Sequence, residues 1–199
     1  MIYEATIEGV PVCTGDIICT ADGVDAGILG QLWRALGYIV PGEIDHAVLY
    51  LGPGGRCVEA GGRGVIVFTM PAGRWDAAAL FAERWLLDRF VGIADPLAGR
   101  GLAAADGLRI RGEVAAYCTA QAGADKPYNV NFFDPETDTA FYCSQLIYKA
   151  YLASGIDLAR SPGAALAYDN ATIILPQHLW QNCVRRRAGG AQASGASLA

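Results

Sequence analysis

Cys143 has the surroundings that a nucleophilic cysteine needs. The segment Cys143–Ser154 has helical periodicity, with apolar residues three, four, seven and eight positions after Cys143. These residues predict one buried face, with Cys143 on it at the N-terminal end of the helix. Unpaired N–H groups and the helix dipole at that end favour a thiolate and can serve as an oxyanion hole. The same pattern also fits an ordinary buried cysteine in an apolar helix.

His46 and Glu59 lie on two strand-like runs joined by a Gly/Pro turn. Residues 46–51 and 56–60 flank Gly52–Gly55, a pattern typical of a β-hairpin. With a loop of two or four residues, residue 59 faces residue 48 and therefore shares a strand face with His46. Diagonal neighbours on one face lie about 7–8 Å apart, so Glu59 can accept the imidazole N–H. A loop of odd length would send Glu59 to the opposite face.

A cysteine, a histidine and a carboxylate together support acyl transfer. In this interpretation the Cys143 thiolate attacks an acyl carbon, and His46 takes the thiol proton and later gives one to the leaving group. Glu59 orients the histidine, and water or a second nucleophile releases the thioester. The competing interpretation is a non-catalytic binding domain, with a hydrogen-bonded histidine at a strand end and an exposed hairpin carboxylate.

Four segments resemble a known enzyme family. The run "DHAVLYLGPGGRCVEA" (45–60) is similar to the histidine hairpin of NlpC-type papain-like cysteine hydrolases. "KPYN" (126–129) and "YCSQLIYKAY" (142–151) resemble that family's tyrosine-bearing loop and nucleophile helix. Here the histidine precedes the cysteine, as in the circularly permuted branch with YiiX- and YebB-like proteins and lecithin–retinol acyltransferase relatives. "GDI" (15–17) resembles that branch's opening strand.

The resemblance implies roles for individual residues. It makes Cys143 the nucleophile, His46 the base and Glu59 the orienting residue, and it assigns the hydroxyl of Tyr128 to the oxyanion hole. It implies no metal and no organic cofactor. The substrate would be a small peptide or peptidoglycan fragment, cleaved at an amide such as that between D-glutamate and a diamino acid, or an acyl lipid. The candidate oxyanion and substrate-binding residues are Tyr128, Tyr142 and Ser144.

The elements around these residues predict an α+β fold, a permuted papain-like antiparallel sheet packed against helices. We expect one domain over residues 1–187 and a flexible tail over 188–199. Residues 71–122 match no part of the family and could form a substrate-selecting insertion. A predicted helix over Trp75–Phe90 would favour lipid acyl transfer if it lined an apolar groove. The further predictions are strands over 16–20, 64–69 and 171–175, helices over 25–38 and 108–122, a loop over 92–107, and a frayed, solvated Arg185–Arg187.

Composition narrows the possible partners. The 199 residues are 53% hydrophobic and 18% charged, which is typical of a compact globular chain. A net charge of -5 and a pI near 4.9 disfavour nucleic acid and anionic membrane surfaces as partners. No apolar run reaches the roughly 18 residues that a membrane span needs, and no signal peptide is visible. We therefore expect a cytoplasmic chain, while the oligomeric state stays open.

The six cysteines do not follow a zinc-binding or disulfide pattern. No pair has CxxC spacing, and the two histidines are far apart in sequence. The chain is also long and apolar enough to fold without disulfides. We expect reduced cysteines, five of them buried and structural, with Cys143 as the reactive exception.

Overall fold

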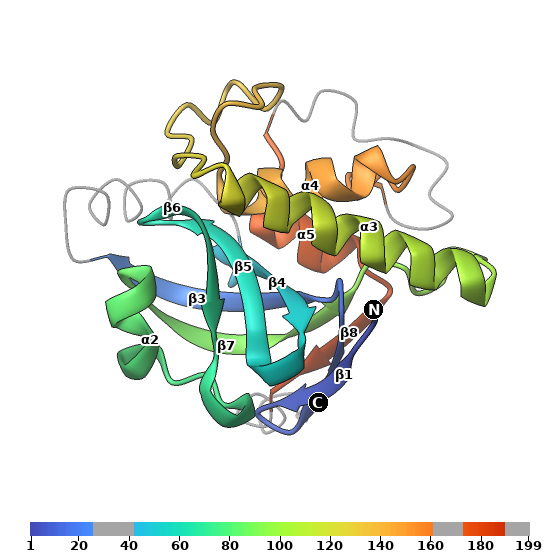
Figure 1. The fold of residues 1–199 in the computed structure, drawn as a ribbon, viewed down its shortest axis with the longest axis horizontal. Helices are drawn as coiled ribbons and strands as arrows, with labels where there is room; N and C mark the ends of the chain where they lie inside the picture. The colour runs from blue at the N-terminus through green and yellow to red at the C-terminus, as the bar shows by residue number, and fades with distance from the viewer. Residues whose placement is uncertain (26–41, 161–172, 190–199) are drawn as a thin grey trace, which may run out of the picture.

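The computed structural model describes residues 1–25, 42–160 and 173–189. A six-stranded antiparallel sheet with the order β6-β5-β4-β3-β7-β8 forms its centre, and β1 and β2 form a separate hairpin. Helices α3, α4 and α5 lie over one side of the sheet, while α2 lies beside β3 and β7 (Figure 1). The described residues therefore have the α+β architecture that the sequence predicts, with four α-helices packed on an antiparallel sheet.

The strands are β1 (Glu4–Ile7), β2 (Val10–Cys13), β3 (Ile17–Asp25), β4 (His46–Gly52), β5 (Arg56–Gly61), β6 (Gly64–Thr69), β7 (Leu86–Asp95) and β8 (Arg185–Ala188). The helices are α2 (Ala77–Arg84), α3 (Ala104–Gly123), α4 (Cys143–Ala153) and α5 (Pro176–Asn182), with short 3-10 turns η1 (Pro53–Gly55) and η2 (Pro71–Gly73).

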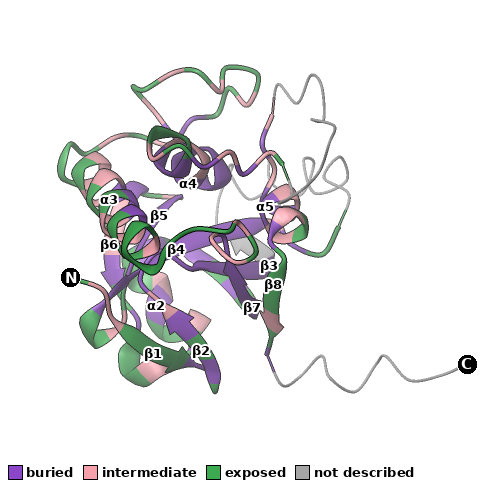
Figure 2. Cartoon of the chain, turned by 90° about the vertical axis from the view of Figure 1, so that its right-hand side faces the viewer, coloured by how far each residue is buried: buried purple, intermediate pink, exposed green. Residues whose placement is uncertain are grey.

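The sheet is buried on both faces because its strands alternate between two apolar clusters. Ile17, Ala47 and Leu49 contribute to a cluster with α3, α4 and α5. The intervening residues Ile18 and Val48 join a second cluster with β1, β2 and α2. Figure 2 shows the sheet and the inner side of α4 as buried. A strand covered on both faces holds its residues firmly, which suits a site that needs fixed geometry.

The β4–β5 hairpin has the predicted register. Leu49 pairs with Val58 and Tyr50 with Cys57, which are the pairs expected if residue 48 faces residue 59. The turn itself differs from the prediction, because a bulge at Gly52 and the three-residue turn η1 connect the strands. The bulge absorbs the odd residue, so the register beyond it is that of an even loop.

The predicted helix over Trp75–Phe90 is wrong. Asp76 caps a shorter helix, α2, by accepting the N–H of Ala79, and the chain leaves that helix at Trp85 in the left-handed region, with φ 60°. Strand β7 follows directly, with alternating buried and exposed residues at its start. The pairing of this segment with β3 therefore outweighs the helical spacing of its apolar residues. Residues 92–107 are likewise not one loop, since they include the end of β7 and the start of α3.

The segment 71–122 is part of the sheet and its covering layer. It supplies β7, which pairs with β3 on one side and β8 on the other, and α3, which packs against α4. The segment is therefore integral to the fold of this chain. That it is an insertion relative to the resembled family, or selects a substrate, stays a prediction.

Two predictions for the C-terminal part need correction. Residues 173–175 are not a strand, and Pro176 is the first residue of α5, a position that suits proline because its missing N–H has no helical partner. Arg185–Arg187 do not fray, since they lie in β8 and pair with β7. Ala188 also belongs to β8, so the predicted tail begins too early. The rest of that tail, the predicted helix over 25–38 beyond Asp25, and residues 171–172 lie outside the described residues.

Candidate active site

Cys143 is the first residue of α4, as the sequence predicts. It is 1% exposed, and the helix buries Leu146, Ile147 and Ala150 behind it. Gln145 stabilises the helix start, because its Oε1 accepts the backbone N–H of Tyr142 at 3.1 Å. The first turn of a helix has N–H groups without a partner inside the helix. Because Cys143 begins this turn, these groups can stabilise negative charge on its thiol.

His46 begins β4 and faces Glu59 of β5 across the hairpin. Its Nε2 lies 2.9 Å from Glu59 Oε2, and both side chains are at most 4% exposed. Because Glu59 engages Nε2, Nδ1 is the nitrogen left for Cys143, whose thiol hydrogen-bonds to the ring. The three residues that the sequence singled out thus meet in one place, although they come from β4, β5 and α4.

The electrostatics of this site favour a charged imidazole. Burial alone would lower the pKa of His46, but the Cys143 thiolate and the Glu59 carboxylate outweigh it and raise that pKa to about 10. Burial would raise the pKa of Glu59, and the charge of Arg84 together with the hydrogen bond from His46 lowers it instead to about 2. The site therefore stabilises an ionised carboxylate beside an imidazolium.

Arg84 and Asp88 complete the site, and the sequence interpretation missed both. Arg84 Nη2 lies 2.8 Å and Nε 3.0 Å from the two carboxylate oxygens of Glu59, and Nη1 lies 2.8 Å from Asp88 Oδ1. The arginine is fully buried, with its guanidinium 4.9 Å and 4.7 Å from the ring centroids of Phe68 and Trp75. The only signal in the sequence was an Arg/Asp pair at i,i+4, which on a helix would have been an ordinary surface pair.

Tyr128 is the candidate oxyanion residue that does not belong to the segment around Cys143, and its hydroxyl interacts electrostatically with Cys143. It lies in a loop that forms a bridge to Phe141, two residues before Cys143. Burial raises the pKa of its hydroxyl well above the usual value, and electrostatic interaction with Cys143 and Tyr142 adds to this effect. The phenol therefore keeps its proton, which is the form that can donate to an oxyanion.

Tyr142 and Ser144 bind the chain at Ile174. The Tyr142 hydroxyl accepts the backbone N–H of Ile174 at 3.3 Å, and Ser144 Oγ donates to its carbonyl at 2.6 Å. Ser144 therefore uses its hydroxyl proton within the protein, so this proton is not left for a substrate. Its side chain positions the helix, while its backbone N–H remains in the first turn beside Cys143.

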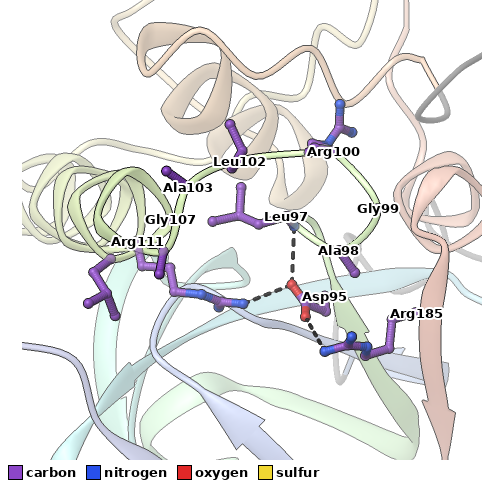
Figure 3. A pocket seen from close by; sticks show the side chains of 13 residues that line it. Asp95, Leu97, Ala98, Gly99, Arg100, Leu102, Ala103, Gly107, Arg111 and Arg185 are labelled. Atoms are coloured by element: carbon purple, nitrogen blue, oxygen red, sulfur yellow. Dashed lines mark hydrogen bonds and ion pairs between the residues drawn. The ribbon is translucent and has the colours of Figure 1, made fainter.

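A second polar region lies at the other end of β7. A shallow pocket of about 310 Å³ there is lined by the loop before α3, by Arg111 and by Arg185. Asp95 accepts from Arg111 at 2.8 Å, from Arg185 at 3.4 Å and from the N–H of Leu97 at 3.1 Å (Figure 3). Arg111 and Arg185 pair with Asp95, Arg100 donates to the carbonyl of Pro96, and neither a nucleophile nor a histidine is among the lining residues.

The described residues contain neither a candidate metal site nor a helix that could span a membrane. Within residues 1–25, 42–160 and 173–189, no group of three or more His, Cys, Asp or Glu side chains is placed to hold a metal ion. All six cysteines are free thiols, and only Cys13 is more than slightly exposed. In the same ranges no helix is long and apolar enough to span a bilayer.

Comparison with protein-family models, with curated proteins and with solved structures gave no significant match. The geometry of the Cys143 site is therefore the basis of the functional argument.

Proposed function

We propose that the chain is a cysteine hydrolase that cleaves an amide bond through a thioester acyl-enzyme. The observation that carries this proposal is the meeting of three side chains from distant segments: Cys143 at a helix N-terminus, His46 hydrogen-bonded to it, and Glu59 2.9 Å from the far nitrogen of the ring. Nucleophile, base and orienting group are recognised by this geometry and not by their order along the chain.

The proposed reaction has two halves. In the first, Cys143 Sγ bonds to the acyl carbon, the C–N bond breaks, and the imidazolium of His46 gives its proton to the leaving nitrogen. In the second, His46 takes a proton from water, the water oxygen bonds to the acyl carbon, and the C–S bond breaks. The N–H groups of the first turn of α4 and the Tyr128 hydroxyl stabilise the oxyanion in both halves.

The substrate we propose is a small peptide of the cell-wall type, following the resemblance to NlpC-type hydrolases. The histidine-before-cysteine order and the antiparallel sheet agree with a permuted papain-like fold, which is part of the same proposal. Lipid acyl transfer is the weaker alternative, because the helix expected over Trp75–Phe90 to line a groove ends at Arg84 and Trp75 lies in the core beside Arg84.

A binding domain that merely keeps these residues would need them for structure only. Ion pairs buried this deeply rarely add stability over apolar side chains of the same size, so their presence favours a functional reason. The decisive difference is reactivity, since a structural triad has no need of a thiol that reacts with an acyl donor.

The test uses iodoacetamide labelling across pH, followed by mass-spectrometric assignment of the site. We expect fast labelling of Cys143 near neutral pH, and slowing of at least about tenfold in His46→Ala, since the imidazolium no longer stabilises the thiolate. Cys13, the half-buried thiol, is the internal control and should label equally in both proteins. Incubation with p-nitrophenyl acetate should add one acetyl group to Cys143. Labelling of Cys143 that is slow and indifferent to His46 would contradict the proposal.

A further inference from the structure

Arg84 poses an electrostatic problem for the proposed triad. A carboxylate that orients a catalytic histidine also stabilises the imidazolium by its negative charge. Glu59 gives both of its oxygens to Arg84, at 3.0 Å from Nε and 2.8 Å from Nη2, and His46 shares one of those oxygens. The permanent positive charge of Arg84, paired with Glu59, would cancel much of the negative charge with which Glu59 stabilises the imidazolium of His46.

Asp88 restores the missing charge. It binds the other side of the same guanidinium, with Oδ1 2.8 Å from Nη1 and Oδ2 2.9 Å from Nη2. Glu59 and Asp88 bring two negative charges and Arg84 brings one positive charge, so the buried group keeps one net negative charge. The imidazolium of His46 is then the cation that neutralises it.

The position of Asp88 is fixed by other contacts, and the network is shielded from water. Thr20 Oγ1 donates to Asp88 Oδ2 at 2.7 Å, and Trp75 Nε1 donates to Oδ1 at 3.1 Å. The side chains of Arg84, Asp88 and Glu59 are all 0% exposed. Charges in such a place are screened little by solvent or salt. The charge of Asp88, which reaches His46 through Arg84 and Glu59, therefore still affects the protonation of the imidazole.

We propose that Asp88 is a positioning residue of the Cys143–His46–Glu59 site: by balancing the charge of Arg84, it leaves Glu59 able to hold His46 as an imidazolium. This inference rests on the proposed function for its catalytic meaning. Within residues 1–25, 42–160 and 173–189, the titratable or charged groups around His46 are Cys143 from α4, Glu59 from β5, Arg84 from α2, Asp88 from β7, Cys19 from β3, Tyr128, and its chain neighbour Asp45.

The experiment follows the imidazole signals of the chain by NMR across pH. The chain has only two histidines, so His46→Ala assigns both signals and His178 serves as an internal reference. We expect Asp88→Asn to lower the pKa of His46 by about one unit, the size expected for one charge about 10 Å away at an effective dielectric constant near 20. An unchanged His46 titration in folded Asp88→Asn protein would overturn the proposal.

Two control variants separate charge from structure. Asp95→Asn removes an equal charge from the far end of the same strand. Trp75→Phe removes the hydrogen bonds from Nε1 to Asp88 Oδ1 and to the Asp88 carbonyl without changing any charge. Both should leave the His46 titration within about 0.3 units of wild type. A shift in Trp75→Phe as large as that in Asp88→Asn would mean that Asp88 acts through its packing and would overturn the charge-balance proposal.

A double variant gives a second, independent test that holds even if Asp88→Asn does not fold. In Arg84→Gln with Asp88→Asn, one positive and one negative charge are lost, so the net charge beside Glu59 is the same as in wild type. We expect its His46 pKa to return to within about 0.3 units of the wild-type value. A double variant with a clearly lowered His46 pKa would overturn the proposal.

The outcome also separates this inference from the proposed function. The NMR titration reads the network whether or not Cys143 transfers an acyl group, whereas acetylation by p-nitrophenyl acetate reads the nucleophile. In an active enzyme, Asp88→Asn should move the alkaline limb of kcat/KM to lower pH, because His46 then loses its proton earlier. An alkaline limb that stays in place while the His46 titration moves would show that the network does not act in catalysis.

Discussion

Two arginine-bridged pairs of carboxylates lie at opposite ends of the same two strands. At one end Arg84 joins Glu59 and Asp88, and Thr20 of β3 donates to Asp88 of β7. At the other end Arg111 joins Asp16, just before β3, to Asp95 at the end of β7, at 2.7 Å and 2.8 Å. Both clusters contain one guanidinium between two acids, and both leave one negative charge to be neutralised.

The two clusters differ in what neutralises that last charge. In the Arg111 cluster, Arg187 of β8 neutralises it at 2.8 Å from Asp16, and the more exposed Arg185 adds a further positive charge at 3.4 Å from Asp95. Arginine stays charged at every accessible pH, so the positive charges of this cluster do not change with pH. In the Arg84 cluster the partner is His46, which can gain or lose a proton. The same arrangement of charges thus fastens β8 to the sheet at one end and supports a proton-transferring site at the other.

The largest expected effect comes from removing the bridging arginine at each end. Arg84→Met leaves Glu59 and Asp88 buried with no guanidinium between them, and we expect a loss of about 3–5 kcal/mol in the free energy of unfolding. Arg111→Met should cost less, about 1–3 kcal/mol, since its side chain is 12% exposed and Arg187 still pairs with Asp16. Urea unfolding followed by circular dichroism measures both.

The ranking of these two variants is the informative result. If Arg111→Met is as destabilising as Arg84→Met, the arginines of β8 do not compensate, and the proposed distinction between the clusters fails. Arg84→Lys is the matched control, since it keeps the charge but loses the two-sided fork and should be intermediate in stability.

An alkaline pH dependence of stability is expected at the His46 cluster, whereas burial raises the pKa of Asp16 in the Arg111 cluster and places its contribution on the acidic side. The pKa of His46 is raised from 6.5 to about 10, so the folded chain binds the imidazole proton more tightly than the unfolded chain does. This contribution to stability is fully present below pH 6.5 and is lost as the pH rises through about 10. We expect the wild type to lose on the order of 5 kcal/mol across this window, and His46→Ala to lack this slope.

The reference variant for this titration is His178→Ala. Burial lowers the pKa of His178, so its contribution changes on the acidic side and the alkaline slope should persist in this variant. An alkaline slope that survives in His46→Ala would assign the dependence to other groups, such as the buried thiols.

The sequence was sufficient to predict the local part of the site. The periodicity behind Cys143 predicted α4 and the place of the thiol at its start, because one helix face must be buried. The hairpin pattern predicted the register that brings Glu59 to His46. Both inferences depend on residues close together in the chain, where the period of a helix or strand decides the geometry.

The Arg84 cluster could not be predicted from the sequence, because it depends on contacts between distant segments. Arg84 and Asp88 are four residues apart, which suggests one helix, yet the helix ends between them at Trp85 and Asp88 lies on β7. Pairing of β7 with β3 decides this outcome, and nothing within residues 75–90 signals it. Arg185–Arg187 were misjudged for the same reason, since their partners Asp16 and Asp95 are 171 and 90 residues away.

The smallest expected effect concerns Arg185 and Arg187, the two arginines of β8 in the Arg111 cluster. Arg185 is 62% exposed and reaches Asp95 only at 3.4 Å, so Arg185→Gln should change the free energy of unfolding by no more than about 0.5 kcal/mol. Arg187 is 26% exposed and lies 2.8 Å from the buried Asp16, so Arg187→Gln should cost more. Equal losses in urea unfolding would mean that exposure does not separate the two pairs. With the expected ranking, Arg187 and Arg111 together neutralise Asp16 with cations that keep their charge, whereas the cation beside Glu59 is His46, which can lose its proton.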